Sequence, residues 1–288
     1  MAIAQSRQVA GMLAERAGCR VEIVGVTTLG DVSRAQLTQI GGTGVFVSAL
    51  RDALRSGEVD LAVHSLKDLP TGPAAGIVLA AVPARDDPRD ALVARDGAKL
   101  ADLPAGARVG TGSPRRAAQL LGLRGNAGTR LDKVAEGELD GLVLAHAGLA
   151  RIGRVHAVTQ VFEPDEMLPA PGQGALAVEC RDDEPELAAL LAAVTDEASL
   201  AAVSAERSLL EALAAGCSAP VGAYAEGTWP LRMRAAVLST DGARALRAHG
   251  SAPAADARRL GRDLAAELLR RGAADLISGQ QGPGEQQE

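Results

Sequence analysis

Apolar and polar residues alternate along the first two thirds of the chain with two different periods. From Met1 to Ala17 the apolar positions recur at the spacing of one helix face, and Gly18 follows as a stop signal. A second helix is predicted to open at the glycine cluster 41–44 and to run to about Arg55. Short apolar runs, which are typical of strands, occupy 21–26, 59–63 and 77–82. This alternation predicts an α/β fold with parallel strands.

The polar turn 86–90 interrupts the alternation and indicates a domain crossing. After it we expect a strand ending at 108–110, a helix that begins at Ser113-Pro114, and a strand at 139–145. Serine is a favoured N-cap, and proline is a favoured first residue of a helix. The segment 169–174, rich in Pro and Gly, is interpreted as a rigid linker. The strand after it, 175–179, is expected to return to the first sheet.

The last third of the chain has another pattern. A helix is predicted from about 200 to 214, short strands alternate between 219 and 249, and a helix covers 254–271. This part is interpreted as a small α+β domain, and the polar residues 278–288 as a disordered tail. The expected domains are 1–83 with 175–192 for domain 1, 89–168 for domain 2 and 197–277 for domain 3.

Composition narrows the classes of function. Of the 288 residues, 47% are hydrophobic and only 1% aromatic, so we expect cores built from Ala, Val, Leu and Ile. Scarce aromatic side chains and a net charge of −6 argue against binding of nucleic acid or of an anionic membrane surface. Without a signal peptide or an apolar run of about 18 residues, a cytoplasmic protein with no membrane span is expected.

Cysteine and histidine give no sign of a metal site. Cys19, Cys180 and Cys217 lack the spacing of metal ligands, and their odd number fits free thiols in a reducing compartment. His146 and His156 have no partner at ligand spacing. Cys217 lies in a tight loop between a helix and a strand, so it is either a small buried hydrophobe or an exposed nucleophile.

The segment His64-Ser65-Leu66-Lys67-Asp68 directly follows a predicted strand. Ligands of open α/β sheets bind beyond the carboxyl ends of the strands. Lys67 and Asp68 are then either an exposed ion pair, or a place where Asp68 acts as a general acid or faces a cationic intermediate.

Arginines gather at the ends of the elements that follow. Lysine is rare among the 30 basic residues, which codon bias explains, but planar guanidinium groups also suit carboxylates and phosphates. The glycine turn before Ser113 leads into a helix N-terminus, where free N–H groups and the helix dipole favour anions. Five arginines at the ends of strands or helices predict a binding wall for carboxylates or phosphates: Arg115, Arg116, Arg124, Arg130 and Arg151.

Taken together, these segments resemble the hydroxymethylbilane synthase (porphobilinogen deaminase) family. The most specific stretches are HSLKD, RGNAGTR and GQGALAVECR. Further matches in the family's order are GGTGVFVSAL, DDPRDALV, VGTGSPRRAAQL, LAHAGLARIG and SAERSLLEALAAGCSAPVGAYA. They cover most of residues 20–275.

The resemblance implies a fold and a set of site residues. Domains 1 and 2 would be two periplasmic-binding-protein-like lobes, with mixed sheets flanked by helices, followed by the small α+β domain. Cys217 would hold a covalent dipyrromethane cofactor by a thioether, and Asp68 would be the catalytic carboxylate. Cofactor-binding residues would further include Ser65, Lys67, Ser113, Arg115 and Arg116. Substrate-binding residues would be Arg124, Arg130, Arg151 and Gln173.

The implied reaction condenses four porphobilinogen molecules on the cofactor, releases ammonia at each step and then frees hydroxymethylbilane by hydrolysis. The pyrroles carry acetate and propionate groups, which the arginines would pair, and Asp68 would stabilise a cationic azafulvene. The protein is expected to act as a monomer without a metal.

Three differences from the family pattern stand out. The family's first strand and its Thr-Arg-x-Ser loop have no counterpart, only seven residues separate Arg116 from Arg124, and Gln39 and Thr43 stand where many members have lysine. From the first two differences we expect weakened lobes and little or no synthase activity. Two alternatives therefore stay open: an impaired paralogue that binds pyrroles, and a bilobal solute-binding protein.

Overall fold

The computed structural model describes residues 1–26, 44–124, 139–216 and 218–278. The chain forms two compact units. The first consists of Met1–Asp87 and Gly172–Leu200, and the second of Pro88–Pro171 and Ala201–Glu288. The change of unit at Asp87/Pro88 lies within the polar turn 86–90.

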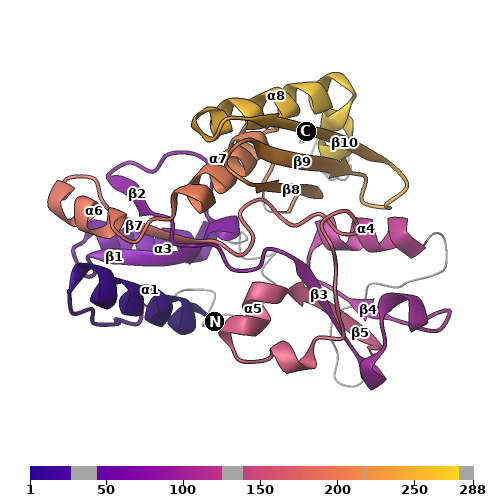
Figure 1. Ribbon diagram of the computed structural model, residues 1–288, viewed down its shortest axis with the longest axis horizontal. Coiled ribbons are helices and arrows are strands. Elements are labelled where there is room, and N and C mark those ends of the chain that lie inside the picture. Colours follow the sequence, from indigo (N-terminus) through magenta and orange to yellow (C-terminus); the bar gives the residue numbers. More distant parts are fainter. Residues whose placement is uncertain (27–43, 125–138, 217, 279–288) are drawn as a thin grey trace, which may run out of the picture. The chain divides into compact units, whose positions relative to one another are not determined.

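The first unit is a three-stranded sheet with helices packed against it (Figure 1). Its strand order is β1-β7-β2, with β1 at Leu61–Ser65, β7 at Leu176–Arg181 and β2 at Ile77–Ala81. The helices are α1 (Ala2–Ala17), α3 (Gly44–Arg55) and α6 (Pro185–Ala192). Val9 and Leu13 of α1 pack with Val178 of β7 and with Leu191 of α6 in one buried cluster. The helices predicted from Met1 to Ala17 and from the glycine cluster 41–44 to about Arg55 are confirmed as α1 and α3.

Two expectations for this unit are wrong. Residues 21–26 form no strand, and Ile23 and Val24 are 41% and 49% exposed. A strand needs a neighbour to pair its backbone groups, and no described strand pairs with this segment. The strands are also not parallel, because both β1 and β2 run antiparallel to β7. The central strand β7 arrives after an excursion through the other unit, so the rule for local crossover connections does not set its direction.

The second unit contains two sheets. The sheet of its first part has the order β4-β5-β3-β6, with β4 at Val109–Gly110, β5 at Gly141–Ala145, β3 at Asp90–Ala94 and β6 at Gln160–Val161. Among its described pairs only β4 and β5 are parallel. The helices of this part are α4 (Pro114–Arg124) and α5 (His146–Arg151). Leu92, Val143, Phe162 and Met167 are fully buried in its core.

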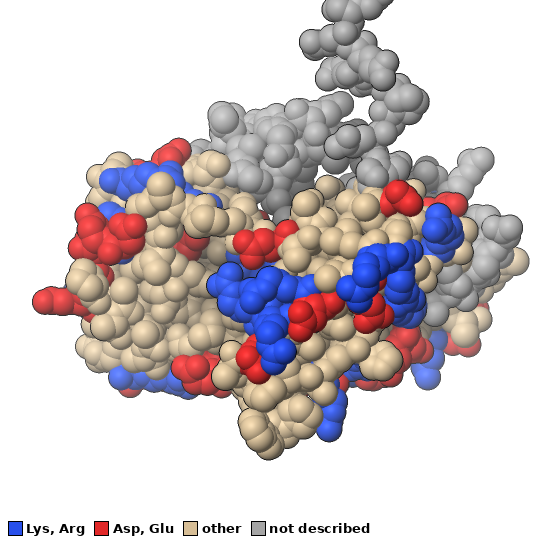
Figure 2. Space-filling view, turned by 90° about the horizontal axis from the view of Figure 1, so that it is seen from above, with Lys and Arg blue, Asp and Glu red and all other residues tan. Residues whose placement is uncertain are grey.

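The other sheet is an antiparallel meander, β8 (Val221–Glu226), β9 (Leu231–Leu238) and β10 (Ala245–Ala252). It packs with α7 (Glu197–Ala212), α8 (Ala257–Arg270) and α9 (Ala273–Ser278) around a core of Ala, Val and Leu, as the composition predicts. On the face seen in Figure 2, basic and acidic side chains are interspersed. Short 3-10 helices occupy Leu66–Asp68, Arg95–Gly97, Leu100–Asp102, Val155–Ala157 and Ala254–Asp256.

The described elements therefore form a mixed α/β fold with sheets flanked by helices and an α+β part near the C-terminus, which confirms the predicted fold class. No single helix in the described ranges has the length and hydropathy of a membrane span. The pair α6 and α7 passes that test only together, across a 109° bend. The predicted tail 278–288 lies almost wholly outside the described residues.

Gly261 permits a close crossing of α7 and α8. A Cβ at this position would lie 2.1 Å from the carbonyl oxygen of Ala205 and 2.6 Å from Oγ of Ser208. Oγ of Ser208 lies 3.0 Å from the Arg258 carbonyl of the other helix and 2.8 Å from the Ser204 carbonyl of its own, so its one proton is shared between them. Because the obstacle is backbone, a side chain here must separate the helices.

We expect Gly261→Ala to lower the free energy of unfolding by roughly 1–3 kcal/mol, the usual cost of overpacking. Thermal and urea unfolding would measure the change. Gly11→Ala is the matched control, since α1 has open space at this position. The control should be neutral or stabilising by up to about 1 kcal/mol, because alanine favours a helix. Equal effects of the two substitutions would contradict the crossing.

Candidate functional site

The segment from Ser65 to Asp68 forms a tight turn at the end of β1. Ser65 ends the strand, and Lys67 and Asp68 lie half-buried in the 3-10 helix after it. The amide of Leu66 donates to the carbonyl of Ala175 at 3.0 Å. The turn is thus fixed to the segment that leads into β7.

Gln173 lies in that neighbouring segment. A Cβ at Gly172 would come within 3.3 Å of the Lys67 backbone nitrogen, so the two segments are in close contact. The Gln173 carbonyl accepts a hydrogen bond from Nε of Arg85 at 2.8 Å, and the residue is only 1% exposed. The first unit therefore brings together four residues predicted for the site: Ser65, Lys67, Asp68 and Gln173.

Buried polar groups support the turn from beneath. Nε2 of Gln5, on α1, donates to Oγ of Ser65 at 2.6 Å. Next to Ser65, Nε2 of His64 lies 3.2 Å from Oε2 of Glu179 on β7. The Arg51 guanidinium of α3 holds the same carboxylate with two bonds, at 2.7 and 3.0 Å. Burial acts to raise the pKa of Glu179, but hydrogen bonds and charge from His64 and Arg51 outweigh it and lower that pKa to about 2.

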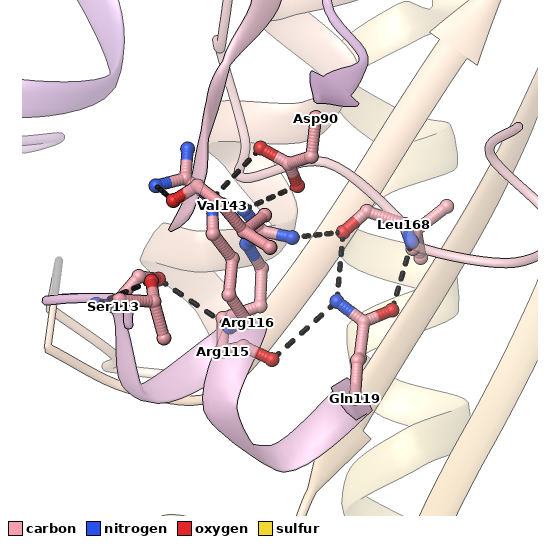
Figure 3. A network of polar contacts seen from close by, with 8 residues as sticks. Asp90, Ser113, Arg115, Arg116, Gln119, Val143 and Leu168 are labelled. Atoms are coloured by element: carbon pink, nitrogen blue, oxygen red, sulfur yellow. Dashed lines mark hydrogen bonds and ion pairs between the residues drawn. The ribbon is translucent and has the colours of Figure 1, made fainter. Parts of the chain in front are cut away.

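In the second unit, one carboxylate holds the two arginines of α4 (Figure 3). Oδ2 of Asp90, the first residue of β3, lies 2.8 Å from Nη2 of Arg115, and its Oδ1 accepts from Nε of Arg116 at 2.8 Å. Arg116 also donates to the Val143 carbonyl of β5 at 3.4 Å. Ser113 caps the helix, because its Oγ accepts the Arg116 amide at 3.4 Å.

The described ion pairs of this cluster join two guanidinium groups to one carboxylate, which is an excess of positive charge among these three side chains. Burial lowers the pKa of the Arg115 guanidinium, although the charge of Asp90 opposes the shift. An arginine nevertheless stays protonated at neutral pH, so two guanidinium groups face one Asp90 carboxylate. The helix dipole at the start of α4 adds to the positive potential. An anion is the partner that this arrangement favours.

The remaining predicted residues are placed only in part. Arg151 is half-buried at the end of α5. Arg124 is the last residue of α4, but its side chain is outside the described part of the chain. Arg130 and Cys217 also lie outside the described residues, so their predicted roles stay predictions.

Sequence reasoning missed three residues that hold the predicted ones in place: Asp90, Glu179 and Gln5. Glu179 interrupts an apolar run, Gln5 lies on the buried side of a helix, and Asp90 lies where the polar turn meets an apolar run; all three are buried. Buried polar groups need partners, so that pattern was an available signal. Among the described residues, no group of three or more His, Cys, Asp or Glu side chains could hold a metal ion.

The low pKa of Glu179 makes part of the stability pH-dependent. A depressed carboxyl pKa contributes stability above the ordinary value of 4.5, and this contribution is lost as the pH falls towards about 2. We expect Glu179→Gln to unfold at lower denaturant concentration at pH 7, and to lose less further stability than the parent between pH 4.5 and 2. Urea unfolding across that range is the measurement.

Glu186→Gln is the control for this experiment, because Glu186 is an exposed carboxylate of α6 in the same unit. The control should follow the acid profile of the parent. A parallel profile for Glu179→Gln would mean that Glu179 does not titrate with the depressed pKa.

Comparison with known proteins extends over almost the whole chain. Residues 1–189 match the family model of the porphobilinogen deaminase, dipyromethane cofactor binding domain, and residues 200–270 match that of the porphobilinogen deaminase, C-terminal domain. The porphobilinogen deaminase of Thermobifida fusca is 58% identical, with 96% of this chain and 93% of that protein covered. Porphobilinogen deaminase 1 of Streptomyces coelicolor is 53% identical, with 96% and 94% covered.

Among solved structures, the methionine binding protein MetQ superposes with a TM-score of 0.40 at 13% identity, over 64% of this chain and 83% of that protein. The two relatives, by contrast, are 58% and 53% identical over nearly their full length. The chain belongs to the porphobilinogen deaminase family.

Proposed function

We propose that this chain is a hydroxymethylbilane synthase, a transferase of tetrapyrrole biosynthesis. It condenses four porphobilinogen molecules head to tail, releases ammonia at each step and frees hydroxymethylbilane by hydrolysis. Membership of the porphobilinogen deaminase family is the observation that carries the proposal. The alternative of a solute-binding protein is set aside, since the family match includes the C-terminal domain at 200–270.

The residues of the second unit fit an anionic cofactor. When bound, a dipyrromethane supplies the covalent primer to which the substrate pyrroles are added. We assign attachment to the thiolate of Cys217 and not to a serine or threonine hydroxyl, because a hydroxyl is far less nucleophilic than a thiolate near neutral pH. Ser113, Arg115 and Arg116 offer one hydroxyl and the positive excess over Asp90 for its carboxylates. In the first unit, Ser65 and Lys67 are further cofactor-binding residues of the proposal.

Asp68 is the catalytic carboxylate of the proposed reaction. It follows β1 in a turn that the Leu66–Ala175 hydrogen bond fixes, so its position changes little during turnover. A fixed negative charge stabilises a cationic pyrrole and can exchange a proton with its nitrogen. Arg124, Arg130, Arg151 and Gln173 bind the substrate carboxylates and the growing chain. We further propose that the protein acts as a cytoplasmic monomer.

The impaired-paralogue alternative differs from the synthase in turnover. The described helix α4 ends at Arg124, which is also the first residue of the segment RGNAGTR. We keep the expectation that the shortened segment lowers turnover. The test of the proposed function therefore has to measure cofactor attachment and turnover separately.

Cofactor attachment is measured by intact mass. After incubation with porphobilinogen, the parent chain should gain the mass of two pyrrole units, and Cys217→Ser should abolish the gain because the attacking thiolate is lost. Cys19→Ser is the matched control and should be modified like the parent. A parent chain that keeps its bare mass would contradict the cofactor assignment. Attachment without further consumption of porphobilinogen, beyond the two molecules that each chain takes up, would identify the impaired paralogue.

The role of Asp68 is tested by removing its charge. Asp68→Asn should still acquire the cofactor mass but consume porphobilinogen at least ~10²-fold more slowly, the lower range for a lost acid–base group. Asp60→Asn is the control, since this carboxylate lies just before β1, is 77% exposed and pairs with Arg181 at 3.4 Å. It should consume porphobilinogen at the parent rate. Similar rates for both variants would remove Asp68 from the catalytic group.

A further inference from the structure

A short backbone segment, Met167–Pro169, lies between α4 and the C-terminal sheet. On its α4 side, the amide group of Gln119 pairs with both backbone groups of Leu168 (Figure 3). Oε1 of Gln119 accepts the Leu168 N–H at 2.8 Å, and Nε2 donates to the Leu168 carbonyl at 3.1 Å. Nη1 of Arg115 donates to the same carbonyl at 2.6 Å. Gln119 thus binds this segment as a neighbouring strand would.

On its other side, the segment touches the first half of β8. The Ala223 amide donates to the Pro169 carbonyl at 2.9 Å. A Cβ at Gly222 would lie 3.0 Å from the Leu168 carbonyl oxygen and 3.1 Å from the Leu168 Cβ, so the two backbones approach closely. The Leu168 side chain is buried in one cluster with Ala118, Ala236 and Leu238. We call this contact, made by Gln119, Leu168, Gly222 and Ala223, the Leu168 joint.

The Leu168 joint connects two parts of the candidate site. Four residues before Gln119 the chain has Arg115, and Ser113 caps the same helix. The loop 216–220, which carries Cys217, runs directly into β8. A hydrogen bond from the Leu238 amide of β9 to the Pro220 carbonyl, at 3.0 Å, ties that loop to the sheet, and one from the Ala219 amide to the Gly216 carbonyl, also 3.0 Å, closes the loop on itself. Movement of β8 along α4 would therefore move the loop relative to Ser113 and Arg116.

We propose that Gln119 is a positioning residue, which sets the attachment loop in register with the carboxylate-binding start of α4. Gln119 is 3% exposed and forms side-chain bonds only to backbone groups in the described part of the chain, so it touches no reacting atom itself. If a side chain without an acceptor replaces Gln119, the Leu168 N–H loses this hydrogen bond. Because an unsatisfied buried N–H is costly, we expect the segment Met167–Pro169 to shift until the N–H has another acceptor. This role rests on the proposed function, because the position of the loop 216–220 relative to the start of α4 matters only if a bound primer contacts both.

The main experiment compares two glutamines of the same unit. Gln119→Leu removes the Leu168 bonds at similar volume. Gln160→Leu is the control. Oε1 of Gln160 likewise accepts a backbone N–H, that of Leu100 at 2.8 Å, but Gln160 and Leu100 are not part of the Leu168 joint. Both variants are incubated with porphobilinogen, each at the same interval below its own melting temperature. Intact mass then gives the fraction of chains that carry the two-pyrrole addition.

For Gln119→Leu we expect a loaded fraction at least ~3-fold lower than for Gln160→Leu, because even a small misplacement of a reacting group lowers its rate. Hydrogen exchange of the Ala223 amide should become roughly tenfold faster in Gln119→Leu but not in Gln160→Leu, because this N–H bonds across the joint. Gly222→Ala should disturb the joint from its other side and give the same two changes. The double variant Gln119→Leu/Gly222→Ala should then be less than additive.

The outcomes separate the two proposals. A parent chain that never gains mass overturns the proposed function. A parent that loads, with Gln119→Leu loading as well as Gln160→Leu, overturns the positioning role alone. Faster Ala223 exchange with unchanged loading also overturns it, because the joint would then stabilise the fold without placing the attachment loop.

Discussion

One buried carboxylate, Asp90, makes the start of α4 possible. Two arginines in the first turn of a helix oppose the helix dipole and repel each other, and burial makes both effects larger. Asp90 neutralises one of the two charges at 2.8 Å from each guanidinium. A second carboxylate would neutralise the cluster and remove its affinity for an anion. The single Asp90 is therefore a compromise between a fold that tolerates buried arginines and a site that still attracts carboxylates.

A similar compromise supports the turn that carries Asp68. Glu179 is buried on the central strand and is held by Arg51 of α3 and by His64 of β1. Its charge is used inside the first unit, to fix one helix and one strand end to the sheet. Leaving one partner unpaired in such a group costs more than the pair itself contributes, so the three side chains act together. Asp68 then projects from a turn whose base has little freedom.

The sequence predicted a helix correctly where the apolar residues along its own buried face are enough to identify it. Helix α8 shows this, since its apolar stripe matches the residues that are buried. In α1 the match is partial, because Val9 and Leu13 are buried but Ile3 is 59% exposed. The prediction failed at 21–26, because an apolar run specifies a strand only if a neighbour pairs with it. It failed again for strand direction. Strand β7 pairs with β1 although more than a hundred residues separate Ser65, the end of β1, from Leu176, the start of β7. Local patterns carry no information on such returns.

The candidate site shows the same limit. Motifs within one segment, such as the one from Ser65 to Asp68 and the one from Ser113 to Arg116, were recognisable because their residues are adjacent. Their supporting partners come from distant segments: Glu179 lies 128 residues from Arg51, and Leu168 lies 49 residues from Gln119. Which distant carboxylate or backbone group meets a given side chain depends on sheet order and register, which only the folded chain defines.

The two kinds of support differ in what they allow chemically. An ion pair such as Asp90 with Arg116 changes the charge of the site, so it sets which ligands are attracted. A side-chain amide such as that of Gln119 is neutral, and it satisfies a backbone donor and a backbone acceptor without changing the charge nearby. Next to a cluster whose positive excess has to be kept, an amide can fix the backbone where an added carboxylate would cancel the excess. Gln119 thus holds the Leu168 segment beside the C-terminal sheet without changing the charge at the start of α4.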